Sequence, residues 1–190
     1  MILPLVLLTM AALAVITPLI TTALRRNAGY VLAAGFCGVG VLLGTQMGNV
    51  LAGRTLTASL PWIPALGVSA TLRLDGLAAL FCLLVLGVGV LIMGYCPRYL
   101  QPDGRHTQIY VLLTLFGTAM LGLVLADDLV LLFVFWELTS VISFLLIGAG
   151  REGAVRPAIR ALVVTSCGGL GLLVAVILLE ATGTTRLSDV

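Results

Sequence analysis

Apolar residues occur along this chain in long uninterrupted runs, and short polar or basic segments separate them. A helix needs about 20 mostly apolar residues to cross the roughly 30 Å hydrocarbon core of a bilayer. The runs do not alternate between polar and apolar residues as the strands of a transmembrane barrel do. We therefore predict six transmembrane helices, at residues 2–23, 28–52, 76–95, 109–126, 129–149 and 158–179.

The connection at residues 53–75 differs from these runs. It contains prolines, alternating Thr and Leu residues, and a tryptophan of the kind that lies at membrane interfaces. We predict an extracellular loop here, with a short hairpin as one form it can take.

The composition fits the same picture. The 190 residues are 61% hydrophobic and 9% charged, with a mean hydropathy of +1.21, far more apolar than a soluble domain of this length. The first run has no basic segment before it and no small-residue cleavage site after it, so we expect it to remain as a helix. The expected fold class is an all-α integral membrane protein, with one partial transmembrane domain over residues 1–190.

The arginines fall unevenly between the predicted helices. Seven lie in alternate connections, beginning after the first helix, and three lie in the others. Short cytoplasmic loops collect positive charge, so we expect an external N-terminus and a cytoplasmic loop from Arg151 to Arg160. Because membrane topology accounts for these arginines, we expect no nucleic-acid partner. The seven are Arg25, Arg26, Arg98, Arg105, Arg151, Arg156 and Arg160.

The sequence shows no pattern of residues that is typical of a metal site or a cofactor site. The four cysteines (Cys37, Cys82, Cys96 and Cys167) have no CxxC spacing, and His106 is the one histidine. We interpret the cysteines as buried free thiols. The glycines of residues 168–171 are interpreted as packing positions, and Gly40, Gly44 and Gly48 as a stripe that lets another helix approach. We expect no metal and no cofactor.

The candidate chemistry rests on Glu137, which lies within the predicted helix at residues 129–149. A charge near the bilayer centre costs several kcal/mol unless it is paired, hydrated or neutralised, so such residues usually face a bundle interior or a water-filled path. Burial favours the protonated carboxyl and a nearby cation favours the carboxylate, so this group can exchange a proton. The functional hypothesis is that Glu137 couples proton and cation movement; the alternative is a structural glutamate tied to a neighbouring helix.

Three hydroxyl residues surround this glutamate. Ser140 and Ser143 follow it along the same helix face, and Thr139 lies beside it. We expect their hydroxyls to support the carboxylate through hydrogen bonds or an ordered water.

Three further acids stand at predicted helix starts. Asp75 precedes the third helix, and Asp127 and Asp128 precede the fifth. An aspartate there can accept hydrogen bonds from first-turn N–H groups. We favour capping for all three, with a role in drawing cations to an outer mouth as the alternative.

The run ADDLVLLFVFWELTSVISFLLIG, the segment LDGLAALF and the later stretches RALVVTSCGGLGLL and TGTTRLSDV resemble the A-type subunit of the Mrp-type multisubunit sodium/proton antiporters. That subunit is related to the antiporter-like proton-pumping subunits of respiratory complex I. The resemblance covers about Asp75 to Val190 and is weaker before it. The complex I relatives tend to read WEGVG where this chain reads WELTS at residues 136–140, which favours the Mrp branch.

The resemblance implies that Glu137 is the glutamate of the family's fifth helix, which pairs with a lysine on a broken seventh helix. It also implies other antiporter subunits, sodium ions and protons as partners, in a bacterial plasma membrane. This chain has no lysine, so the lysine-bearing helices must come from elsewhere. We expect either the N-terminal part of a longer reading frame or one half of a split subunit.

Three functions remain open from the sequence. The first is a transporter subunit that exchanges sodium or another monovalent cation for protons. The second is an enzyme component, a proton-pumping membrane subunit of a complex I-like or hydrogenase-linked oxidoreductase such as NADH-quinone oxidoreductase. The third is a truncated or assembly fragment that transports nothing.

Overall fold

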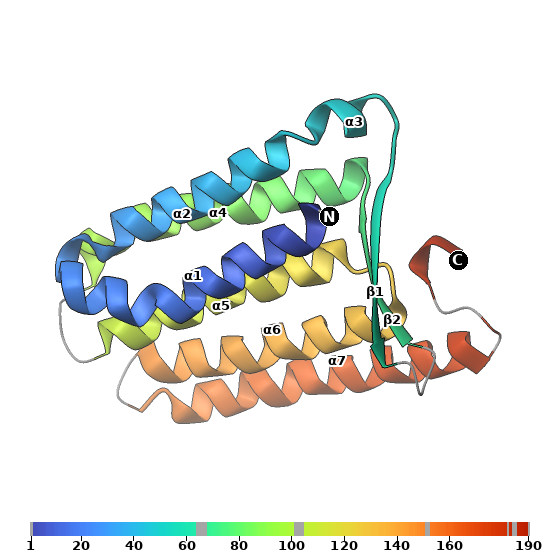
Figure 1. Cartoon of the computed structure of the whole chain (residues 1–190). Helices are drawn as coiled ribbons and strands as arrows, with labels where there is room; N and C mark the ends of the chain where they lie inside the picture. The colour runs from blue at the N-terminus through green and yellow to red at the C-terminus, as the bar shows by residue number, and fades with distance from the viewer. Residues whose placement is uncertain are drawn as a thin grey trace.

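The computed structural model describes residues 2–63, 68–100, 105–150, 153–181, 183 and 186–189. Within them, long helices lie side by side and alternate in direction along the chain (Figure 1). Their apolar length confirms the expected all-α membrane fold. The long helices are α1 (Ile2–Leu24), α2 (Ala28–Gly44), α4 (Gly76–Tyr99), α5 (His106–Leu125), α6 (Leu129–Gly150) and α7 (Val155–Ala181).

The described chain has five helical stretches that are long and apolar enough to span a membrane. The first of them, Ile2–Gly44, is 43 residues long and contains both α1 and α2. The stretch is about twice as long as one crossing needs. It reverses at a short 3-10 turn, Arg25–Asn27, where Arg25 adopts a φ of 46°. A positive φ is rare for a residue with a side chain and allows the sharp reversal. The stretch therefore supplies two helices, α1 and α2.

The predicted helix at residues 28–52 is divided in the structure. Helix α2 ends at Gly44, and a separate short helix, α3, covers Met47–Leu51. The hydroxyl of Thr45 donates to the Leu42 carbonyl at 2.7 Å, and the amide of Gln46 donates to the Leu43 carbonyl at 2.9 Å. This three-residue bonding tightens the final turn and ends the helix.

The connection before α4 contains two antiparallel strands, β1 (Leu56–Ile63) and β2 (Val68–Leu74). The hairpin crosses one end of the helix bundle (Figure 1). Leu72 and Leu74 of β2 are buried against the helices, and Leu72 also forms a bridge to Ala126 beside the start of α6. The apolar face of β2 therefore closes this end of the bundle, which we call the hairpin end.

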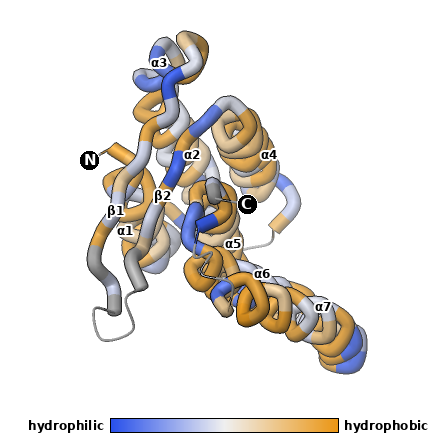
Figure 2. Tube along the Cα trace, turned by 90° about the vertical axis from the view of Figure 1, so that its right-hand side faces the viewer, coloured by the Kyte–Doolittle hydropathy of each residue, from blue (hydrophilic) through white to orange (hydrophobic). Residues whose placement is uncertain are grey.

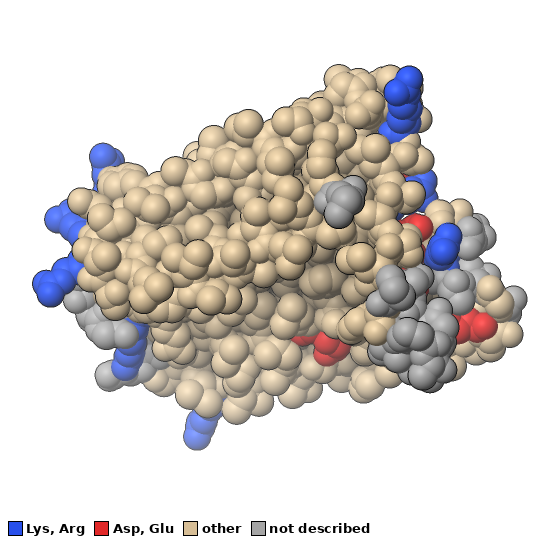
Figure 3. All heavy atoms as spheres, in the orientation of Figure 1, with Lys and Arg blue, Asp and Glu red and all other residues tan. Residues whose placement is uncertain are grey.

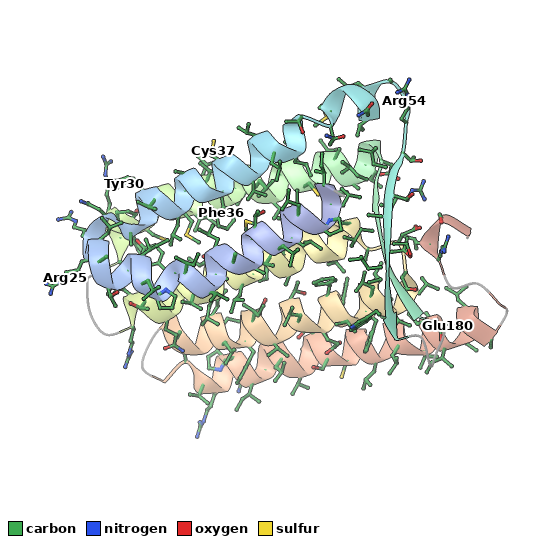
Figure 4. All side chains as sticks on the ribbon, viewed as in Figure 1. Arg25, Tyr30, Phe36, Cys37, Arg54 and Glu180 are labelled. Atoms are coloured by element: carbon green, nitrogen blue, oxygen red, sulfur yellow. The ribbon has the colours of Figure 1, made fainter. Side chains whose placement is uncertain are left out.

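Helices α1, α2, α4 and α5 enclose the main core. Phe36 points from α2 into the bundle (Figure 4), where its ring lies against Gly89 of α4 and Gly117 of α5. Gly29 of α2 provides another close approach, with Pro97 of α4 2.6 Å from where a Cβ would stand. The glycines expected to mediate packing, Gly44 and Gly48, face open space instead. A glycine permits close packing only where it faces another helix, and the four-residue spacing alone does not show which glycines do.

Helices α6 and α7 lie to one side of this core. Helix α6 packs against α5, and α7 packs against α6 at the edge of the bundle (Figure 2). Among the described residues of α7, Ala158, Gly169 and Val176 are buried. The rest of α7 presents an apolar surface to lipid or to another protein.

Most charged residues gather at the two ends of the molecule, and the belt between them is apolar apart from one acidic patch (Figure 3). Arg25 lies at one end, and Arg54 and Glu180 lie at the hairpin end (Figure 4). We call the first the arginine end, because it holds six of the seven arginines counted above; the seventh, Arg151, lies outside the described residues. Of the four cysteines, Cys37 and Cys167 are exposed, which corrects the expectation that all four are buried.

The contact between Phe36 and Gly89 predicts a strong effect of one added methyl group. Gly89→Ala is expected to lower the free energy of unfolding by about 1–3 kcal/mol, because the ring fills the space that the methyl group needs. Gly87→Ala, on the same helix but facing open space, is the matched control and should be neutral or slightly stabilising. Denaturant titration in detergent measures both. Equal stability of the two variants would contradict this packing.

Candidate functional site: a carboxylate at the interface between α6 and α7

Helix α6 begins at a capped junction with α5. The carboxylate Oδ1 of Asp128 accepts a hydrogen bond from the Leu131 amide at 3.0 Å, and the Asp128 carbonyl accepts one from the Leu132 amide at 2.9 Å. The first bond satisfies a first-turn amide that has no backbone partner within the helix, and the second is the first backbone bond of the helix. The apolar run that follows then continues as helix to Gly150.

Glu137 lies well inside this helix. Eight residues separate it from Leu129, which places it about 12 Å from the hairpin end of α6 at 1.5 Å per residue. About 20 Å of helix follow before Gly150. Its side chain is half-buried, while its neighbours Trp136 and Leu138 are exposed on the apolar belt. Its carboxyl group is therefore held at membrane depth.

The carboxyl group of Glu137 lies directly against the backbone of Gly169 in α7. A methyl group at Gly169 would overlap its Oε1 atom and stand 3.0 Å from its Cδ. Gly168 and Gly171, on the same helix, face open space. Gly169 is thus the one glycine of this group whose missing side chain makes room for the glutamate.

Helix α6 is held on its other side by an aromatic contact. The ring of Phe135 lies against Gly122 of α5. Residues two apart on a helix point in nearly opposite directions, so Phe135 and Glu137 face different helices. Packing on α5 thereby fixes the rotation of α6 and directs Glu137 toward α7.

The hydroxyl groups near Glu137 do not donate to it. Thr139 and Ser140 donate to the Trp136 carbonyl, at 2.7 and 3.2 Å, and Ser143 donates to the Thr139 carbonyl at 2.7 Å. Bonding to a carbonyl of the preceding turn is common for Ser and Thr in helices. These three hydroxyls therefore make no direct hydrogen bond to the carboxylate, and their support through an ordered water stays a prediction.

Glu137 also has no ionic partner within the part of the chain that the structure describes. The ion pairs found there join Arg73 to Asp75 and to Asp127, all at the hairpin end. The carboxyl group therefore combines membrane depth and partial burial, and the ion pairs of the described residues do not include it. Such a group has to be neutralised or paired by something beyond α6 and α7.

The three aspartates of the hairpin end have different partners. Asp75 caps α4, accepting a hydrogen bond from the Ala78 amide at 2.9 Å, and it pairs with Arg73 at 3.5 Å. Asp128 caps α6, as described above. Asp127, for which the sequence also suggested a cap, does something else: it joins separate segments of the chain.

Asp127 is 4% exposed, and its carboxylate, its backbone amide and its backbone carbonyl each make a contact. Its carboxylate accepts hydrogen bonds from the amide and hydroxyl of Ser188, both at 3.1 Å, and lies 3.8 Å from Arg73. Its amide donates to the Thr71 carbonyl at 2.9 Å, and its carbonyl accepts from the Leu187 amide at 2.7 Å. Asp127 thus connects β2, the start of α6 and the segment after α7.

The sequence does not indicate three of the residues that make these contacts. Gly169 was assigned to packing in general, and neither Arg73 nor Ser188 stood out. A pair of glycines on the helix after Glu137 was the available signal for Gly169, but the rotation of α6 decides which glycine meets the carboxylate. No group of His, Cys, Asp and Glu residues suited to a metal ion is found among the described residues.

Comparison with known proteins adds evidence from relatives. Residues 126–190 match the family model described as NADH:quinone oxidoreductase/Mrp antiporter, TM, and residues 62–108 match the one described as NADH-Ubiquinone oxidoreductase (complex I), chain 5 N-terminus. The first model thus includes Asp127, Asp128, Glu137 and Gly169.

Two curated relatives come from staphylococci. The chain is 39% identical over 182 residues to the putative antiporter subunit mnhA2 of Staphylococcus haemolyticus, which covers 93% of this chain and 23% of the relative. It is 42% identical over 137 residues to the A1 subunit of the Na(+)/H(+) antiporter of Staphylococcus aureus, covering 71% of this chain and 17% of the relative. The chain therefore spans less than a quarter of the length of these relatives.

Two solved structures have the same fold. A chain in the Mrp complex from Dietzia sp. DQ12-45-1b superposes with a TM-score of 0.89 at 44% identity, covering 99% of this chain and 20% of that one. A chain in the membrane-bound sulfane sulfur reductase, an archaeal respiratory membrane complex, superposes with a TM-score of 0.83 at 19% identity, covering 29% of that chain. The second likeness is evidence for the fold alone.

Proposed function

We propose that this chain is the part of a multisubunit monovalent cation/proton antiporter that carries the carboxylate of Glu137. The chain belongs to the family of membrane subunits that Mrp antiporters share with NADH:quinone oxidoreductases, in the branch of the A-type antiporter subunits. Sodium is the proposed cation, and other antiporter subunits are the proposed partners. The segments that its relatives possess beyond this length would supply the remainder of the path.

The observation that carries this proposal is the position of the Glu137 carboxyl group against Gly169. A structural glutamate buried in a membrane is expected to have its partners within its own bundle. Here the described helices offer a glycine surface and no donor. That arrangement suits a group whose partner changes during a transport cycle.

The chain's own residues would act in two steps. With a cation or a cationic side chain beside it, Glu137 holds a negative charge; with the cation gone, it binds a proton, because a charged carboxylate in this surrounding is costly. Each change alters the electrostatic field at the next titratable group along the path. Inward proton movement is favoured by about 2.3 kcal/mol per charge for each 100 mV of membrane potential, which can drive cation export.

An exchange assay tests the proposed function. Everted vesicles that contain the chain together with its complete set of partners are expected to show a sodium-dependent collapse of a proton gradient. Vesicles that contain the 190-residue chain alone are expected to show none, because this chain lacks a cationic partner for Glu137 and the remainder of the ion path. Exchange by the chain alone would refute the need for partners. NADH-driven proton pumping without sodium dependence, by the assembled complex, would instead establish the oxidoreductase alternative.

For localisation, we propose a bacterial plasma membrane with the arginine end in the cytoplasm and the hairpin end outside. The arginine distribution supports this orientation: among the described residues, six arginines lie at one end and Arg54, Arg73 and Arg186 at the other. Asp75, the least buried of the three aspartates that precede α4 and α6, is the proposed site where cations gather outside.

Cysteine labelling tests the orientation. In a background without native cysteines, Thr55→Cys at the hairpin end is expected to react with an impermeant reagent in intact cells, whereas Val155→Cys at the arginine end is expected to react only after permeabilisation. Both positions are exposed. Labelling of Val155→Cys from outside would reverse the assignment.

A further inference from the structure

A groove runs along the arginine end of the bundle, on the side away from the hairpin. Its walls come from α4, α5 and the junction between α6 and α7, and it encloses about 830 Å³. Figure 2 shows α4 and the α6–α7 pair on either side of α5, and Ile109 and Leu113 of α5 line the groove between them. The residues that define it are Leu91, Tyr95, Tyr99, Ile109, Ile147 and Pro157.

The groove leads to a second recess, deeper in the bundle. That recess encloses about 180 Å³ beside Phe36 and Gly89, and it shares Ile92 and Leu113 with the groove. From Val88 in the recess to Tyr99 at the rim, α4 extends about 17 Å at 1.5 Å per residue. One leaflet contributes about half of the 30 Å hydrocarbon core. The combined length therefore matches that of one leaflet.

The lining changes from aliphatic to interfacial along this length. Aliphatic residues and Phe36 surround the deep part, while Tyr95 and Tyr99 stack near the rim with ring centroids 5.9 Å apart. Tyrosine prefers the level of the lipid head groups. An acyl chain fits the deep part, and a polar head fits the level of the tyrosines.

Two arginines adjoin the residues that line the groove near its rim. Arg98 follows Leu91 by seven residues and so lies on the same side of α4, and Arg156 adjoins Pro157. Both side chains are exposed. The described residues of this end include no Asp or Glu. The rim therefore attracts an anion.

The α4 wall is unlike a helix-docking surface. Helices pack closely in membranes where small residues let the backbones approach. Here Leu91, Tyr95 and Tyr99 project with exposures of 73%, 62% and 70%. Large flexible and aromatic side chains suit a lipid chain, which adapts to an irregular wall.

We propose that this groove binds one anionic phospholipid, with its phosphate at the arginine rim and one acyl chain along α4 toward Phe36. Basic pockets between membrane helices are known to hold anionic head groups, each arginine near such a lipid contributing about 1 kcal/mol. The site is separate from Glu137 and does not depend on the proposed exchange function.

Native mass spectrometry of the full chain, with phosphatidylglycerol or phosphatidylcholine added, tests the site. One phosphatidylglycerol per chain is expected to be retained in preference to phosphatidylcholine. Arg98→Gln is expected to weaken retention about fivefold, the equivalent of about 1 kcal/mol. Arg54→Gln, at the hairpin end, is the matched control and should leave it unchanged. Equal retention of both lipids, or equal loss in both variants, would overturn the proposal.

A photoreactive acyl chain then locates the lipid. Cross-links are expected at Leu91 and Tyr95 and not at Val15 of α1, which is equally open on the bundle surface. The same labelling repeated in the assembled complex identifies other occupants. Loss of the lipid cross-links at Leu91 and Tyr95 in the assembled complex would show that another protein covers the groove and would refute the lipid site.

Discussion

Glu137→Gln is expected to reduce sodium-dependent proton exchange by the assembled complex to the background of vesicles that lack it. Glutamine has nearly the same shape and can lie against Gly169 as glutamate does, so helix packing and protein abundance should not change. What it loses is the titratable charge, and with it the ability to alternate between a cation and a proton. Fluorescence quenching of a pH-sensitive dye, normalised to the amount of complex, measures the loss.

Two further variants separate function from structure at this position. Glu137→Asp keeps the charge one methylene closer to the backbone, and partial exchange is expected. Asp128→Asn should cost far less than Glu137→Gln, because asparagine caps a helix about as well as aspartate. If Glu137→Gln exchanged normally at wild-type abundance, or lost activity only through lost protein, the carboxylate would have a structural role.

Gly169→Ala tests the same site from the opposing helix. The added methyl group overlaps the position of the Glu137 carboxyl group, so that group has to move. We expect reduced exchange with normal abundance, and Gly168→Ala, which faces open space, should retain activity. Equal behaviour of the two alanine variants would show that the contact with Gly169 is not needed.

Much of this fold could be predicted from hydropathy, because lipid leaves the backbone of an apolar run few alternatives to a helix. The starts of α4 and α6 could also be predicted, since Asp75 and Asp128 carry a local signal for capping. The break after Gly44 could not, because it depends on hydrogen bonds of Thr45 and Gln46 within an otherwise apolar stretch. The hairpin is one of two forms that the sequence allows, and β2 is fixed by its contact with the bundle.

The site could be predicted in part for a similar reason. A single carboxylate within an apolar run can be recognised from the sequence alone, so the sequence indicates Glu137. Its neighbours in space are not visible in this way, since the rotation of α6 that turns it toward Gly169 depends on Phe135 packing against Gly122. The supporting hydroxyls followed from spacing, yet Thr139, Ser140 and Ser143 bond to their own helix. Spacing places residues on a face and leaves their hydrogen bonds undetermined.

The contacts of Asp127 illustrate this limit and carry the second prediction. Its partners Arg73 and Ser188 lie 54 residues before and 61 residues after it in the sequence, so no local pattern indicates them. Asp127→Ala removes the acceptor for two hydrogen bonds from Ser188 and one partner of Arg73. Hydrogen bonds to a charged acceptor contribute about 1.5–3 kcal/mol, whereas the Arg73 pair adds less because that arginine is partly exposed to solvent.

We therefore expect Asp127→Ala to lower the free energy of unfolding by about 3 kcal/mol, and Asp127→Asn by about 1 kcal/mol, since asparagine keeps an acceptor oxygen for Ser188. The loss should be local first: the segment after α7 is released, and trypsin cleaves faster after Arg186, which lies two residues before Ser188 and is exposed. Asp75→Asn is the control, because asparagine still caps α4 and the ion pair with Arg73 that it loses is mostly screened by solvent. Cleavage after Arg186 at the wild-type rate in Asp127→Ala would mean that other contacts hold this segment against the hairpin end.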